Sequence, residues 1–205
     1  MMRLYRANFS TNAERVALAL AHKGIEVESR YIDPADRSEV QRVSGQPLVP
    51  VLVHDDRVIP DSMQIVAYLE DLVPSLPLYP RDEARYAEML IFIDWFNLVW
   101  KIAPNRIEAE LALEEPDHML VTRLGREMAA ALDGFEALLA GRKYLMGSEF
   151  SAADCAAFPF LKYAAGRDPL DNESFHRILD KYQQLDDEHF RLRQWIKRVD
   201  AMARA

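Results

Sequence analysis

The chain has 205 residues, half of them hydrophobic, and carries 25 Lys and Arg against 33 Asp and Glu, a formal net charge of −8. This acidic balance, with basic residues spread along the chain, argues against nucleic acid and anionic lipid as partners. No apolar run approaches the ~20 residues needed to span a bilayer, and the amino terminus lacks a signal-peptide pattern. We therefore expect a cytoplasmic globular protein that does not bind membranes.

Cysteine and histidine usage argues against two further kinds of site. The one cysteine, Cys155, rules out an intramolecular disulfide and a Cys-x-x-Cys motif, and its apolar surroundings in the sequence predict a buried structural thiol. The five histidines are widely spaced and form no metal-ligand pattern. We expect no bound metal.

Residues 1–73 predict one α/β unit. Apolar residues recur at helical spacing between Ala13 and Lys23, and Gly24 then ends that helix. "VPVLVHDDRVI" indicates two short strands joined at Asp55 and Asp56. The predicted order is a strand at 3–7, a helix at 13–23, a strand near 27–32, a short helix near 39–43, two strands within 49–59 and a helix after Pro60.

The second half predicts helices alone. Residues 74–82 contain three prolines and no periodicity, which is typical of a linker, and residues 83–205 then form an all-helical domain. Pro104 should end or kink the first long helix. Ser151 and Asp154 have the spacing of a capping box, and they open a very apolar helix. The predicted helices cover 84–101, 121–139, a stretch beginning at 151, and 187–202.

Four strings in the same order resemble the glutathione S-transferase superfamily. They are "STNAERV" at the first helix, "VPVL" at the third strand, "PDS" at the third helix of the α/β unit, and "GSEFSAAD" in the helical half. The resemblance covers nearly the whole chain. It implies a thioredoxin-like domain that binds glutathione, followed by a helical domain that supplies most of the pocket for a second substrate.

The resemblance also implies roles for particular residues. Ser10 falls where serine-type members keep the hydroxyl that faces the glutathione sulfur. Val49 and Pro50 match the residues whose backbone pairs with the cysteinyl part of glutathione, the proline being cis in the family. Asp61 and Ser62 match the residues that bind the γ-glutamyl amine and carboxylate.

The loop before Val49 departs from the family pattern. Members commonly carry a polar Lys, Gln or Thr immediately before the Val-Pro pair, whereas this chain has Leu48 there, preceded by Pro47. Gln46 is the nearest polar replacement for the contact to the glycyl carboxylate.

Three capping residues, Ser10, Thr11 and Asn12, stand in a row at the first helix. Without the family, Ser10 is best interpreted as a simple N-cap. Because Thr11 and Asn12 can also satisfy the first helical N–H groups, the resemblance favours a Ser10 hydroxyl that is free to turn outward.

The aromatic string "IFIDWFNLVWK" allows two interpretations. Ile93, Phe96 and Trp100 share one helical face, which by default predicts core packing or a subunit interface. The family's second-substrate pocket uses this helix, so Trp95, Phe96 and Trp100 are candidates to line it. The excess of large apolar residues, together with the family's dimers, predicts a homodimer.

Three functional hypotheses follow. The first is a glutathione transferase in which Ser10 stabilises a thiolate that attacks a small apolar electrophile. The second is an isomerase of the zeta-class type that acts on maleylacetoacetate with glutathione as cofactor, although this chain has Ser-Thr-Asn where that class has Ser-Ser-Cys. The third is a glutathione-binding or protein-interaction module without activity, which the altered Gln46-Pro47-Leu48 loop favours.

Overall fold

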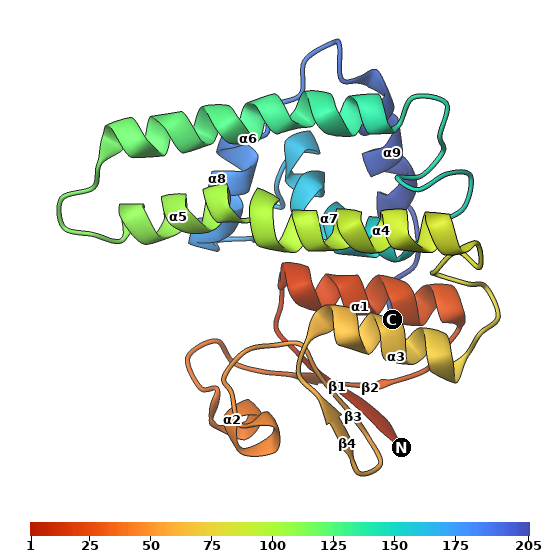
Figure 1. The fold of residues 1–205 in the computed structure, drawn as a ribbon. Coiled ribbons are helices and arrows are strands. Elements are labelled where there is room, and N and C mark those ends of the chain that lie inside the picture. Colours follow the sequence, from red (N-terminus) through yellow and green to blue (C-terminus); the bar gives the residue numbers. More distant parts are fainter. The chain divides into compact units, whose positions relative to one another are not determined.

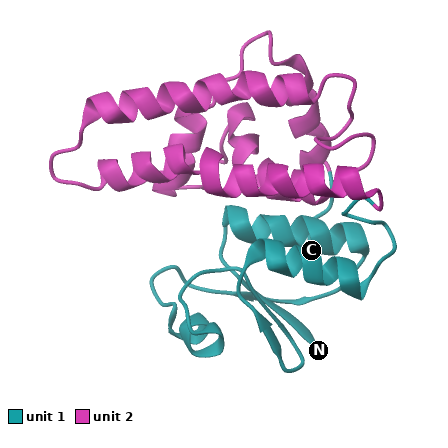
Figure 2. Ribbon diagram, in the orientation of Figure 1, with its two compact units in different colours: residues 1–80, 202–205 teal, residues 81–201 magenta.

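The computed structural model describes residues 1–205, which form two compact units (Figures 1 and 2). The first contains Met1–Pro80 together with Met202–Ala205, and the second contains Arg81–Ala201. The predicted fold class, an α/β unit followed by a helical one, is confirmed.

The first unit is a four-stranded sheet with three helices. Strand β1 pairs in parallel with β2 and antiparallel with β3, and β3 pairs antiparallel with β4, which gives the order β2-β1-β3-β4. Helices α1 and α3 lie side by side along the sheet in Figure 1. The elements are β1 (Met2–Arg6), α1 (Thr11–Lys23), β2 (Glu28–Tyr31), α2 (Ser38–Ser44), β3 (Val51–His54), β4 (Arg57–Ile59) and α3 (Ser62–Leu72).

The core of this unit follows the predicted apolar pattern. Leu4 and Leu52, which are register partners on β1 and β3, are fully buried, as are Val16 on α1 and Ile65 on α3. Gly24 ends α1 in the left-handed conformation with φ 64°, which glycine adopts without steric cost.

The structure divides the chain at positions other than the predicted domain ends at 73 and 205. The stretch predicted as a linker packs on the α/β unit as far as Pro80, because Lys23 donates to the carbonyls of Val73 and Ser75 and Leu78 is fully buried. The last four residues also belong to this unit rather than to the helical one. Arg204 pairs with Glu14 at 3.1 Å, and the amide of Ala205 donates to Ala17.

The second unit is all-helical. Every residue of α7 is buried, and the predicted capping box between Ser151 and Asp154 is present at its amino terminus. Asp154 also accepts a 2.7 Å hydrogen bond from the indole of Trp195, which ties α7 to α9. The elements are α4 (Glu83–Trp95), η1 (Phe96–Trp100), α5 (Ile102–Leu111), α6 (His118–Leu138), α7 (Ala152–Leu161), η2 (Lys162–Ala165), α8 (Ser174–Tyr182) and α9 (Phe190–Asp200).

Two features of this unit correct the sequence predictions. Pro104 itself is the third residue of α5, in the first turn, where its missing N–H is not needed for helical bonding, and the long helix predicted over 84–101 is interrupted just before it, at Lys101. The helical path changes earlier, in the π-helix η1, where the amide of Lys101 donates to the carbonyl of Phe96 five residues back. Neither α5 nor α8 was predicted, although Phe175, Ile178 and Leu179 of α8 have helical spacing.

Candidate functional site

Ser10 lies at the turn between β1 and α1. Its Oγ accepts a 3.2 Å hydrogen bond from the amide of Ala13, so Ser10 is itself the N-cap. The expectation that Thr11 or Asn12 would take over this task is wrong, because only the residue just outside the helix has the extended backbone a cap requires. The hydroxyl proton of Ser10 is still available, since an Oγ that accepts one bond can donate another.

The residue before this cap has an unusual backbone. Phe9 has φ 59°, a left-handed conformation that non-glycine residues seldom adopt. The amide of Ser10 then donates to the carbonyl of Ala7 at 3.3 Å, which closes a tight turn at the end of β1. Such conformations are typical of functional turns, and here the turn fixes the position of the Ser10 side chain.

Val49 and Pro50 lead into β3. The peptide bond between them is cis, as in the family. The side chain of Val49 packs against the small core formed by Tyr5, Ile32 and Val51. No hydrogen bond within the chain uses the N–H or C=O of Val49, so this backbone can pair with an extended peptide.

Asp61 and Ser62 stand at the amino terminus of α3. Asp61 is the N-cap, and its Oδ1 alone accepts from the amides of Met63 and Gln64, both at 2.9 Å. The second carboxylate oxygen of this exposed residue is therefore left for an ammonium group. Ser62, by contrast, is only 5% exposed, so a ligand can reach it only from the amino-terminal end of α3.

Arg15, the arginine of the "STNAERV" string, has a partner at the start of α3. Its guanidinium is 2% exposed and donates from Nη1 to Oγ of Ser62 at 3.4 Å. A buried cation is costly unless it is paired or hydrogen-bonded, and the amino terminus of α3 already favours an anion. This pair adds positive charge to the place where a carboxylate was expected.

Gln46 makes a local contact that the sequence did not reveal. Its Nε2 donates to the carbonyl of Leu48 at 3.0 Å, and its Oε1 accepts from the amide of Leu48 at 2.6 Å. The side-chain amide thus closes the loop immediately before Val49, while Leu48 itself is 65% exposed. Gln46 orders the backbone beside the cis-proline, and one hydrogen of its amide group is left for a ligand.

The sheet register brings these residues to one edge of the first unit. Tyr5 of β1 pairs with Val51 of β3, so the turn after β1, which carries Ser10, lies beside the entry to β3. Arg15 connects α1 to the start of α3. The site therefore combines a hydroxyl at one helix start, an unpaired backbone segment, and a carboxylate with a buried cation at a second helix start. This set matches a tripeptide that has a thiol, an extended backbone, an ammonium group and a carboxylate.

The three aromatic candidates lie in the helical unit. Phe96 and Trp100 are buried and stack with ring centroids 4.5 Å apart, and both contact Phe135 and Phe160. This is the core packing that the spacing predicted by default. Trp95 is 38% exposed and also contacts Phe135, at 5.8 Å.

Three other features lie outside this site. Cys155 is fully buried in α7. No helix is both long and apolar enough to cross a membrane. No group of three or more His, Cys, Asp and Glu side chains is arranged to hold a metal ion.

The fold and the site together define a class, that of two-domain proteins in which an α/β unit with a cis-proline site precedes a helical unit. The family models described as "Glutathione S-transferase, N-terminal domain" and "Glutathione S-transferase, C-terminal domain" match residues 4–77 and 119–198. The chain belongs to the glutathione S-transferase family.

Individual relatives agree with this assignment. The chain is 31% identical to Glutathione S-transferase 1 of Dianthus caryophyllus, over 94% of this chain and 90% of the relative. It is 30% identical to Glutathione S-transferase Z1 of Arabidopsis thaliana, over 89% and 86%. It is also 29% identical to a Stringent starvation protein A homolog of Pasteurella multocida, over 78% and 74%.

Solved structures share the fold. Rice GST1, solved in complex with glutathione, superposes with a TM-score of 0.77 at 24% identity, over 98% of this chain and 86% of that one. The beta-etherase LigF of Sphingobium gives a TM-score of 0.79 at 20% identity, over 98% and 95%.

Proposed function

We propose that this glutathione transferase binds glutathione in its first unit and ionises the thiol at Ser10 for attack on an apolar electrophile. The observation that carries the proposal is the position of the Ser10 hydroxyl. It caps α1 through its oxygen, and it retains a proton that can be donated to a sulfur anion at the positive end of that helix.

The hydrogen bond from Ser10 and the helix end can together supply the free energy that is needed to lower the thiol pKa. A thiol with a pKa near 8.5 is only about 3% ionised at pH 7, and lowering that pKa by ~2 units requires ~2.7 kcal/mol. A hydrogen bond to an anion contributes roughly 1.5–3 kcal/mol, and the helix end adds roughly 0.3–1 kcal/mol. Together they ionise most of the bound thiol at neutral pH.

The remaining residues of the site would bind the rest of glutathione. The unpaired N–H and C=O of Val49 would pair with the cysteinyl residue as a strand edge does. The free oxygen of Asp61 would accept from the γ-glutamyl ammonium. Ser62, with Arg15 behind it, would hold the adjacent carboxylate. Gln46 would reach the glycyl carboxylate with its second amide hydrogen.

In the reaction, the thiolate sulfur forms a bond to the electrophilic carbon of the second substrate, and the leaving group departs with the electron pair of the bond that breaks. Proximity and thiolate stabilisation are then the main contributions of the protein. Trp95, which is 38% exposed, remains the candidate for contact with the second substrate, whereas Phe96 is fully buried in the aromatic core. The buried indole N–H of Trp100 has no hydrogen-bond partner, and a polar substituent of that substrate could accept from it.

A second candidate is glutathione-dependent isomerisation of maleylacetoacetate. It is favoured by the similarity to Glutathione S-transferase Z1 and by the "STNAERV" opening of α1. In that reaction the thiolate would add to the substrate and leave again without net conjugation. A non-catalytic binding module is a third candidate, and the exposed Leu48 in the altered loop favours it.

Three measurements separate these candidates. Retention on immobilised glutathione and turnover of an aryl halide, followed by the absorbance of the conjugate, support the transferase. Turnover of a cis-enone to the trans isomer without consumption of glutathione supports the isomerase. A folded protein that neither retains glutathione nor turns over either substrate supports the module.

A further inference from the structure

Residues Met202–Ala205 pack on α1 within the first unit (Figure 2). Two groups of the Arg204 guanidinium, Nε and Nη2, donate to Oε1 of Glu14 at 3.3 and 3.1 Å. Arg6 of β1 donates from Nη1 to the carbonyl of Ala205 at 2.6 Å and so holds the same segment from the other side. These bonds fix the Arg204 guanidinium beside the first turn of α1.

Glu14 lies one helical turn after Ser10. The amide of Glu14 donates to the carbonyl of Ser10 at 2.9 Å, as in any helix whose residues bond to the fourth residue before them. Side chains that are four residues apart on a helix are neighbours, with about 5–6 Å between their Cβ atoms. The Glu14 carboxylate is therefore close to the place where we expect the glutathione sulfur.

The negative charge of Glu14 has two opposite consequences. A carboxylate in the first turn stabilises α1, because it interacts favourably with the positive end of the helix. The same charge opposes a thiolate at that helix end, because a like charge nearby disfavours ionisation of the thiol. Only 15% of the Glu14 side chain is exposed, so water and salt screen this repulsion weakly. An unpaired Glu14 would thus offset part of the stabilisation that the helix end gives to the thiolate.

The other charged groups at the two helix starts do not remove this repulsion. Arg15 follows Glu14 directly in the chain, but its guanidinium donates to Ser62 of α3. Asp61, the cap of α3, is a further carboxylate. The guanidinium that pairs with Glu14 is that of Arg204, whose side chain is 22% exposed.

We propose that Arg204 neutralises the Glu14 carboxylate and so preserves the positive end of α1 for the glutathione thiolate at Ser10. This role of Arg204 rests on the proposed function, in which glutathione binds with its sulfur at Ser10. Arg204 acts on the thiolate through Glu14 and is thus a positioning residue rather than a catalytic one.

The test is the ultraviolet absorbance of the thiolate of bound glutathione against pH, with saturating glutathione and the full chain. Arg204→Gln leaves Glu14 without this cation and should raise the pKa of the bound thiol by about half a unit to one unit. In the double variant Arg204→Gln with Glu14→Gln, both charges are absent, so the titration curve should return to that of the unmodified chain. A merely structural role of Arg204 would not give this recovery.

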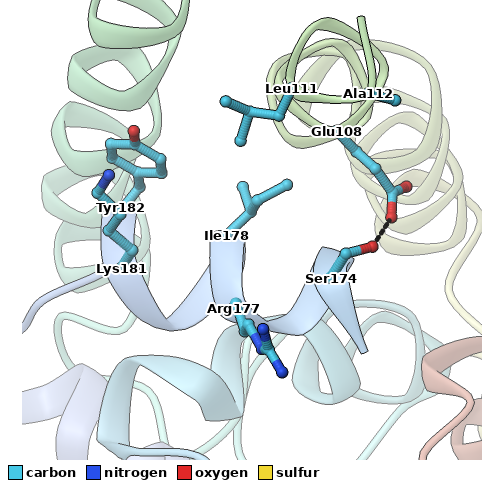
Figure 3. Close-up of a pocket in the computed structure, with 8 residues that line it drawn as sticks. All are labelled: Glu108, Leu111, Ala112, Ser174, Arg177, Ile178, Lys181 and Tyr182. Atoms are coloured by element: carbon cyan, nitrogen blue, oxygen red, sulfur yellow. Dashed lines mark hydrogen bonds between the residues drawn. The ribbon is translucent and has the colours of Figure 1, made fainter. Parts of the chain in front are cut away.

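Arg177→Gln is the matched control, because it removes one cation from the helical unit instead. Arg177 lies on α8 at a pocket of about 330 Å³ between α5 and α8, which Tyr182 also lines (Figure 3). The titration curve of this variant should coincide with that of the unmodified chain. Circular dichroism establishes that each variant is folded.

Three results would overturn this role of Arg204. The curve of Arg204→Gln could coincide with that of the unmodified chain, or Arg177→Gln could give an equal rise in the thiol pKa. In the third, the thiol pKa of the double variant stays as high as in Arg204→Gln, because the effect then does not depend on the Glu14 charge. Failure of the proposed function has a different signature: calorimetry detects no binding of glutathione to the unmodified chain, and both proposals then fall together.

Discussion

Arg15 of α1 donates a hydrogen bond to Ser62 at the start of α3, although the two residues are 47 positions apart in the chain. Both side chains are buried. The bond fixes the amino terminus of α3 relative to α1, whose own amino terminus carries Ser10. Two expected binding elements, the hydroxyl for the sulfur and the start of α3 for the γ-glutamyl group, are thus connected through one buried guanidinium.

Replacement of Arg15 should therefore weaken glutathione binding without removing the thiolate donor. In Arg15→Gln we expect an increase of about tenfold or more in the dissociation constant of glutathione, the size of a lost charge-assisted hydrogen bond. Titration calorimetry measures it. Ser62→Ala, which keeps the guanidinium, should give a smaller increase. Arg30→Gln on the exposed strand β2 is the control, and an equal effect there would contradict the prediction.

The two tasks of Ser10 can be separated by two substitutions. Ser10→Ala removes both the cap and the donor, and it should lower the free energy of unfolding by about 1 kcal/mol, whereas Ser10→Gly should cost only a few tenths because glycine is an acceptable cap. Both variants should raise the pKa of bound glutathione by about one to two units and slow turnover at neutral pH, with recovery at higher pH.

Ultraviolet absorbance of the bound thiolate against pH measures that shift. Titration curves that coincide for the unmodified chain and Ser10→Gly would show that Ser10 is only a cap.

Gln46 should affect glutathione binding through the backbone of Leu48. Gln46→Ala removes both hydrogen bonds that order the loop before Val49, so we expect KM for glutathione to rise by about three- to tenfold, while kcat changes little. For Gln46→Glu, which keeps the acceptor for the Leu48 amide and loses the donor, KM for glutathione should lie between the values of the unmodified chain and of Gln46→Ala. A fall in kcat with KM unchanged would instead give Gln46 a part in the chemical step.

An exposed apolar stripe on α4, η1 and α5 should form a dimer interface. Ile91, Leu98 and Ile102 are 69%, 70% and 48% exposed and recur at helical spacing, which a monomer seldom leaves open to water. Light scattering at micromolar concentration should give twice the mass of the 23.6 kDa chain, and Leu98→Glu should give the monomer mass. Leu170→Glu, at an exposed leucine outside the stripe, is the control, and a monomeric unmodified chain would contradict the prediction.

Acid should lower the free energy of unfolding of the helical unit, because it protonates the Asp171 carboxyl. Burial opposes ionisation of this carboxyl, but hydrogen bonds from His176 and Tyr163, both at 2.8 Å, outweigh it and hold the Asp171 pKa below its usual value. A lowered pKa gives stability that is present above about pH 4, the unfolded value, and is lost as pH falls through the folded value. The free energy of unfolding should therefore be lower in Asp171→Asn by about 2 kcal/mol at pH 7.

That difference should shrink below about pH 4. Urea unfolding followed by tryptophan fluorescence measures it, because Trp95, Trp100 and Trp195 all belong to the helical unit. Asp168→Asn, at an exposed position of the same loop, is the control. A difference that stays constant down to pH 3 would contradict the prediction.

The sequence by itself determined the order of the elements in the first unit and the two-part architecture, because these depend on periodicity and on short capping and turn patterns. The resemblance of four strings indicated the family. The capping box at Ser151 and the stop at Gly24 are such local signals, and both are present. The position of the backbone at Val49, where glutathione is expected to bind, followed from the resemblance of the string that includes its proline.

Tertiary structure decided what local patterns leave open. Three capping residues in a row do not say which of them closes α1, and the extended backbone at Ser10 decides it. Pro104 is compatible with a helix end or with a first turn, and the π-turn before it selects the second. The Arg15–Ser62 bond and the pocket beside Tyr182 join segments distant in sequence, and such pairs form only when burial packs their helices together, because no local energy term couples residues so far apart.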